Sequence, residues 1–146
     1  MKFPIGYVDV RVFAHATEDV DKVLGAIRNV LPPELHETVI FKKKNLAGHY
    51  GNPIVLFEAR IKDKIMAQTV FEKLSSGLST LDKEILSGEI DQRFERGNLY
   101  LRVDKQSAYL GEFKLSSADP IHFRIHFKRH GKEEVLEICR KFGLLP

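Results

Sequence analysis

The sequence of 146 residues has one cysteine, no tryptophan and no apolar run near the roughly 18 residues of a membrane span. A single cysteine cannot form an internal disulfide, which fits a reducing cytoplasm, where we expect the protein to work. The missing apolar run predicts no contact with a membrane. An apolar content of 43% with 29% charged residues excludes a disordered, collagen-like or low-complexity chain. The length fits one domain over residues 1–146.

The sequence also lacks a strong excess of one charge, because 23 Lys and Arg face 20 Asp and Glu, a net charge of +3. An excess this small over the whole chain identifies no partner. Any information about partners must therefore come from where the charges fall on the predicted strands and helices.

Signatures of catalysis are also missing. No P-loop, GxSxG or HExxH motif is present. His122 and His126 share one strand face but would lie about 13 Å apart, too far for one metal ion. Cys139 falls on the apolar stripe of a predicted helix, which favours an inert buried thiol. A metal-dependent nuclease stays open as an alternative, because three acids are predicted on the exposed sheet face or its rim: Asp9, Glu58 and Asp104.

The periodicity of apolar residues predicts the elements. Alternation indicates strands over about 5–14, 37–44, 54–62, 99–103 and 121–127. Helical spacing indicates helices over 18–31, 64–76, about 79–94 and around 135–142. Thr17 is the expected N-cap of the first helix, and Arg96-Gly97 the expected end of the third. The order β-α-β-β-α-α-β-β-α predicts an α+β fold, a single-domain sandwich of a largely antiparallel sheet with helices packed on one face.

The sheet face opposite the helices is predicted to be rich in Lys, Arg and His, whereas many acids fall on helices. Such a split makes a basic surface that attracts phosphates. Aromatic residues between the cations are able to stack on unpaired bases. A merely solvated face is an equally simple interpretation, because an antiparallel sheet with one wet face needs polar residues there.

Two loops also attract attention. Residues 48–53, with the sequence GHYGNP, form either an ordinary tight connection or a loop whose backbone approaches a ligand closely. Residues 104–111, directly after a strand, offer a charge, an amide, a hydroxyl and an aromatic ring. The second segment is equally compatible with a short capped helix that closes the sheet.

Four strings carry a resemblance to a known family: FAHATED at 13–19, GHYGNPIV at 48–55, GNLYLRVDKQ at 97–106 and AYLG at 108–111. Over nearly its whole length the chain resembles an archaeal group of small proteins described as predicted exosome subunits, or as RNA-binding proteins related in fold to ribosomal protein L5. The resemblance implies an RNA-binding α+β sandwich with a ribosomal protein L5-like fold. It brings no catalytic residue.

The leading hypothesis is a non-enzymatic RNA-binding protein, an accessory factor in RNA processing or degradation, without cofactor or metal. The alternatives are a protein-interaction subunit whose basic face docks an acidic partner, and the nuclease. Expected partners are RNA and protein subunits of an RNA-processing complex, and the oligomeric state is open, a dimer included. Phosphates are expected on the cations Arg11, Lys42, Lys44, Arg60, Arg102, Lys105 and Arg124. The remaining RNA contacts are expected from residues of the two loops: His49, Tyr50, Asn52, Gln106 and Tyr109.

Overall fold

Strand β1 (Ile5–His15) lies at the centre of the sheet, and its alternation of apolar and polar residues separates the two faces. The computed structural model describes residues 3–146, apart from the side chain of His49. Every second residue of β1 from Val8 to Ala14 is at most 1% exposed. The residues between them point to the opposite face, because successive side chains of a strand alternate. This confirms the predicted strand and its buried face.

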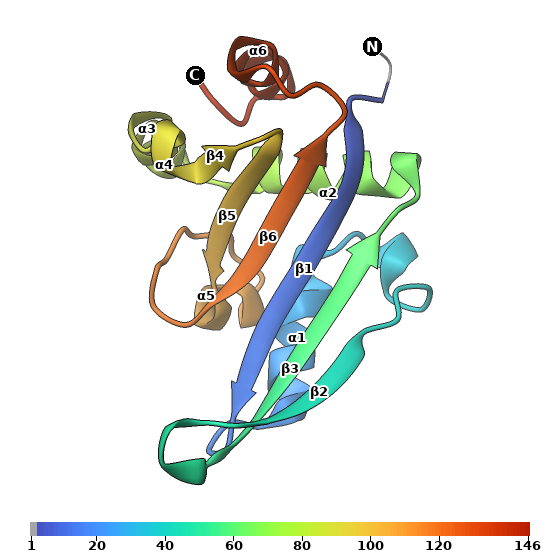
Figure 1. Cartoon of the computed structure of the whole chain (residues 1–146), viewed down its shortest axis with the longest axis vertical. Coiled ribbons are helices and arrows are strands. Elements are labelled where there is room, and N and C mark those ends of the chain that lie inside the picture. The colour runs from blue at the N-terminus through green and yellow to red at the C-terminus, as the bar shows by residue number, and fades with distance from the viewer. Residues whose placement is uncertain (1–2) are drawn as a thin grey trace.

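The six strands form one sheet in the order β2-β3-β1-β6-β5-β4, and every neighbouring pair is antiparallel (Figure 1). The largely antiparallel sheet predicted from the sequence is confirmed. The remaining strands are β2 (Lys42–Ala47), β3 (Pro53–Ile61), β4 (Phe94–Glu95), β5 (Asn98–Asp104) and β6 (Pro120–Phe127).

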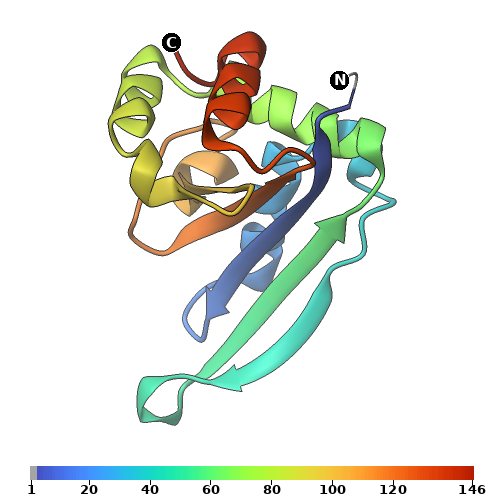
Figure 2. The same cartoon turned by 45° about the horizontal axis from the view of Figure 1, so that its top comes forward.

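Helices cover one face of this sheet, which confirms the α+β prediction; the likeness to ribosomal protein L5 stays a prediction. Helices α1 (Val20–Val30), α2 (Lys64–Gly77) and α5 (Lys105–Tyr109) lie behind the sheet in the view of Figure 1. Helices α3 (Thr80–Gly88), α4 (Ile90–Arg93) and α6 (Lys132–Phe142) lie toward the end of the molecule that carries both termini (Figure 2). Between residues 3 and 146, no helix is both long and apolar enough to cross a bilayer.

Aromatic contacts join the helices to the sheet. Phe71 of α2 is fully buried and meets Phe127 of β6 and Phe142 of α6 edge to face, with ring centroids 5.6 and 5.4 Å apart. Cys139 of α6 is also fully buried, and burial raises the pKa of its thiol to about 12. The cysteine is therefore the inert core thiol that the sequence predicted.

The second strand begins later than predicted. The expected strand over 37–44 is replaced by β2 at Lys42–Ala47, which follows a 3₁₀ turn, η1 (Pro33–Leu35). The amide of Val39 donates to the carbonyl of Leu35 at 3.0 Å and closes a turn over residues 36–38, so the apolar run 39–41 lies in an irregular segment between this turn and β2. Val39 and Phe41 pack against the core, whereas Ile40 is 85% exposed.

Two predicted helix ends are wrong. Asp19, not Thr17, caps α1, because its carboxylate accepts a hydrogen bond from the amide of Asp21 at 2.9 Å. The helix expected over 79–94 breaks into α3 and α4 and is followed by β4. Arg96 and Gly97 have φ of 52° and 80° and form the two-residue turn between β4 and β5, a conformation typical of tight hairpins.

The Phe71 cluster gives a test of the core. We expect Phe71→Ala to lower the free energy of unfolding by about 3–5 kcal/mol, because it leaves a cavity beside the rings of Phe127 and Phe142. Ile65→Ala on the same helix should cost less than about 1 kcal/mol, since Ile65 is 51% exposed. Urea unfolding followed by circular dichroism measures both, and equal losses would contradict this description of the core.

Candidate nucleic-acid interface

The open face of the sheet is hollowed into a groove of about 900 Å³. Side chains of β3, β1, β6 and β5 form its floor, Ile40 and Lys42 lie on the β2 side, and residues of α4 and β4 lie on the other side. Three acidic residues line it, Asp9, Glu58 and Glu95. Seven basic residues line it: Arg11, Lys42, Arg60, Lys62, Arg93, Arg102 and Arg124.

Strand register arranges the floor in two cross-strand rows. The first, here called the Asp9 row, runs Arg60 (β3), Asp9 (β1), Arg124 (β6) and Tyr100 (β5). The second, here called the Arg11 row, runs from β2 to β5 as Lys42, Glu58, Arg11, His122 and Arg102. Neighbouring residues of a row come from adjacent strands, which lie about 4.8 Å apart.

The Asp9 row is partly neutralised by its own carboxylate. Arg60 donates to both carboxylate oxygens of Asp9 at 2.7 and 3.0 Å, and Nη2 of Arg124 lies 2.9 Å from Oδ2. The hydrogen bond to Asp9 raises the pKa of Arg60, against the opposing effect of burial. Tyr7 lies between these groups and His126, with the Arg60 guanidinium 4.1 Å from its ring centroid and the His126 ring stacked at 4.5 Å. Arg60 and Arg124 were both expected to hold phosphates, but their guanidinium groups are already bound.

The Arg11 row keeps its positive charge. Glu58, the acid in this row, lies 2.8 Å from Lys44 of β2. Arg11 and Arg102 are exposed, and neither forms an ion pair with an acid in the part of the chain that the structure describes. Burial lowers the pKa of His122 between them, and both arginines lower it further, against a smaller opposing effect of Asp119. The row therefore presents two arginines beside an imidazole that is neutral at pH 7.

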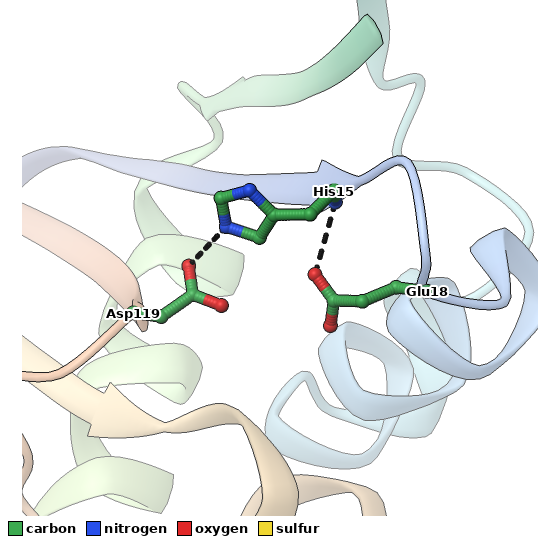
Figure 3. A group of neighbouring side chains, drawn as sticks. All are labelled: His15, Glu18 and Asp119. Atoms are coloured by element: carbon green, nitrogen blue, oxygen red, sulfur yellow. Dashed lines mark hydrogen bonds and ion pairs between the residues drawn. The ribbon is translucent and has the colours of Figure 1, made fainter. Parts of the chain in front are cut away.

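Lys105 lies outside the groove, contrary to its expected place on a phosphate-binding surface. Only 10% of its side chain is exposed. Its ammonium donates to the carbonyl of Phe13 at 2.8 Å, to Glu18 at 2.9 Å and to Asp119 at 2.8 Å. Nε2 of His15 lies 3.0 Å from the other oxygen of Asp119 (Figure 3). The lysine therefore joins the end of β1, the turn before α1 and the segment before β6.

The same cluster bears on the nuclease alternative. Within residues 3–146, one group of potential metal ligands lies close enough to share an ion, namely His15, Glu18 and Asp119, with ligand atoms within 4.8 Å of one another (Figure 3). The ammonium of Lys105 already bridges the two carboxylates and supplies the positive charge there. Asp104, the acid named for a nuclease, caps α5 by accepting from the amide and hydroxyl of Ser107 at 2.9 and 2.7 Å.

The remaining predicted RNA contacts do not line the groove. The turn η2 (His49–Gly51) and Asn52 form the tip of the β2–β3 hairpin, far from α6 in both views (Figures 1 and 2). Tyr50 is 92% exposed there, and the side chain of His49 lies outside the described residues. Gln106 and Tyr109 line a second cavity of about 400 Å³ beside α1 and α5. The segment 104–111 thus contains the short capped helix. Of the cations predicted to hold phosphates, five line the groove: Arg11, Lys42, Arg60, Arg102 and Arg124.

Two basic groove residues, Lys62 and Arg93, were not among the expected contacts. Lys62 directly follows β3 and continues its alternation from Glu58 and Arg60, so the sequence pattern was sufficient to place it on the open face. Arg93 had no such signal, because α4 and the turn that brings it to the groove lie inside what reads as one long helix.

Removing the buried ammonium should destabilise the fold. We expect Lys105→Met to lower the free energy of unfolding by about 2–4 kcal/mol, because Glu18 and Asp119 lose their shared partner. Lys114→Met is the matched control, since Lys114 is exposed and belongs to no ion pair with a described acid, and it should change stability by less than about 0.5 kcal/mol. Equal effects in chemical denaturation would show that the cluster contributes nothing.

The cluster also predicts an acid-dependent loss of stability. Burial alone would raise the pKa of Asp119, but hydrogen bonds from Lys105 and His15 outweigh it and hold this pKa below its usual 3.8. As pH falls, the unfolded chain therefore binds this proton before the folded chain does. The contribution of the Asp119 carboxylate to the free energy of unfolding is complete above pH 3.8 and is lost as pH falls through the pKa of the folded state. Asp119→Asn should flatten the pH dependence of unfolding below pH 4.5. An unchanged slope would contradict this assignment.

Comparison with known proteins places the chain in a family. A model described as RNA binding matches residues 7–127. An RNA-binding protein of Pyrococcus abyssi is 38% identical over 140 residues, which cover 92% of this chain and 91% of that protein. Two solved DUF54 structures share the fold. The one from Archaeoglobus fulgidus has a TM-score of 0.78 and 32% identity, and the match covers 94% of this chain and 99% of that one. The one from Methanothermobacter thermautotrophicus has a TM-score of 0.74 and 29% identity, and the match covers 95% of this chain and 98% of that one. The chain belongs to this RNA-binding family.

Proposed function

We propose that the protein binds RNA through the groove on the open face of its sheet, without a catalytic step. The observation that carries the proposal is the charge of this groove. Seven basic and three acidic residues line it, so its basic excess is larger than the net charge of +3 of the whole chain. A concave surface lined by one sign of charge concentrates counter-ions, and RNA is a polyanion.

The cations differ in how far they are available. Arg60 and Arg124 hold Asp9, and Arg93 lies 3.0 Å from Glu89, its neighbour one helical turn away. Arg11, Lys42, Lys62 and Arg102 form no ion pair with any acid that the structure describes. These four residues are therefore the ones proposed to contact phosphates, while the Asp9 row fixes the shape of the floor between them.

The family match and the name of the Pyrococcus abyssi relative support RNA over an acidic protein as the ligand. We extend the proposal to an accessory role in RNA processing or degradation, on the resemblance to predicted exosome subunits. The proposed absence of catalysis is supported by Lys105, whose ammonium already bridges both carboxylates in the one cluster of potential metal ligands between residues 3 and 146.

The test is the salt dependence of RNA affinity. Fluorescence anisotropy with a labelled single-stranded RNA should give a log–log slope against salt of roughly −3, from about −0.7 for each of four phosphates. Lys42→Glu with Lys62→Glu should weaken binding at least about tenfold at low salt and make the slope shallower by roughly 1.4, because two phosphate contacts are lost.

Lys114→Glu with Lys141→Glu makes the same change of charge at two exposed positions outside the groove, and it should leave the slope within error of the wild-type value. An equal loss in both double variants, or no RNA affinity at low salt, would contradict the proposal. Displacement of the RNA by polyglutamate at equal charge concentration would indicate the acidic protein partner instead.

A further inference from the structure

We propose that Arg11, His122 and Arg102 form a single site for one RNA phosphate, and that His122 takes up a proton from water when the phosphate binds. This inference rests on the proposed function and names the point of the groove where the RNA backbone is held. No covalent bond forms or breaks; the one chemical event is the protonation of an imidazole.

The Asp9 row shows which ligand a pair of arginines on this sheet accepts. There, Arg60 and Arg124 flank β1 from both sides, and between them lies a carboxylate whose two oxygens receive their guanidinium groups at 2.7 to 3.0 Å. The anion of that row is supplied by the protein itself. Bidentate guanidinium groups match carboxylate and phosphate oxygens equally well.

The Arg11 row repeats this pattern one strand further along, without the anion. Arg11 on β1 and Arg102 on β5 flank β6, and the residue between them is His122. The two arginine-bearing strands are about 10 Å apart, two strand spacings, which long side chains span from both sides. Glu58 is the nearest acid within the row, and Lys44 holds it at 2.8 Å on the far side of Arg11. The place that Asp9 fills in its own row is therefore left for an external anion.

The groups that face His122 explain the proton. Arg11 faces it from β1, Arg102 from β5 and Asp119 from the segment before β6, while Arg124 follows on its own strand and Asp104 caps α5 beyond Arg102. Burial and the two arginines lower its pKa, and Asp119 opposes them weakly. A phosphate bound between the arginines adds negative charge beside the ring and stabilises the imidazolium. RNA affinity must then rise as pH falls, because the bound state holds one proton more.

Two kinds of variant test the site. Anisotropy with the same single-stranded RNA is measured from pH 8 to pH 5.5 at fixed salt. The wild-type affinity should rise severalfold over this range, and His122→Gln should abolish the rise. His126→Gln is the matched control: His126 is also half-buried with a lowered pKa, due first to burial and then to His130 and Arg124, but it lies outside the row and should keep the rise. At pH 6.5, Arg102→Gln should lose about tenfold in affinity, and Arg140→Gln, at an exposed position of α6, should lose none.

A measurement on the unmodified chain guards against a variant that fails to fold. In NMR, the titration of the His122 Cε1 proton should move to higher pH when the RNA is added, whereas that of His126 should move less. RNA binding that keeps its pH dependence in His122→Gln, or a His122 titration that the RNA does not move, overturns this inference and leaves the proposed function standing. Absence of RNA affinity in the wild-type chain overturns the proposed function, and the phosphate site with it.

Discussion

The alternation of β1 is the constraint on which the rest of the molecule depends. Because this strand lies at the centre of the sheet, its even-numbered residues from Val8 to Ala14 enter the core, and its odd-numbered residues enter the open face. A slip of register by one residue would exchange the two sets. The same eleven-residue strand thus packs against α1 and α2 on one side and supplies Asp9 and Arg11 to the groove on the other.

Asp9 and Arg11 belong to two different parts of the groove: the Asp9 row, whose charges are paired with one another, and the Arg11 row, whose arginines are not paired with an acid. The carboxylate of Asp9 binds two arginines that would otherwise repel each other, and Tyr7 and His126 stack beside them. In the neighbouring Arg11 row, Arg11 and Arg102 face the imidazole of His122 instead of a carboxylate. The small net charge of the chain therefore hides a groove in which the availability of each cation depends on its cross-strand neighbour.

Much of the fold could be predicted from the sequence because strand and helix periodicities are local. The alternation in β1 and β6 and the apolar stripes of α1, α2 and α6 all correspond to real elements. The errors arose where a local signal competes with a tertiary contact. Val39 and Phe41 are typical strand residues, yet they pack against the core from an irregular segment before β2. Gly97 ends no helix but lies in a hairpin turn, where a Cβ would lie 2.8 Å from the His130 ring.

The site was less predictable than the fold, since ion pairs across strands depend on register. The pattern assigned Arg11, Arg60, Arg102 and Arg124 to one face correctly, but it contains nothing that distinguishes the arginines bound to Asp9 from those left unpaired. Lys105 directly follows a strand whose alternation suggests a surface cation. Its burial depends on Glu18 and Asp119, which are 87 and 14 residues away in the chain.

The central claim is that RNA occupies the groove rather than the hairpin tip or the cavity beside α5. The most direct measurement is the change in backbone amide NMR shifts when a single-stranded RNA is added to the wild-type chain. The account predicts the largest changes along the open-face residues of β1, β5 and β6, centred on Arg11, His122 and Arg102. Changes centred on residues 48–53 or on α5, with these three strands unaffected, would contradict it.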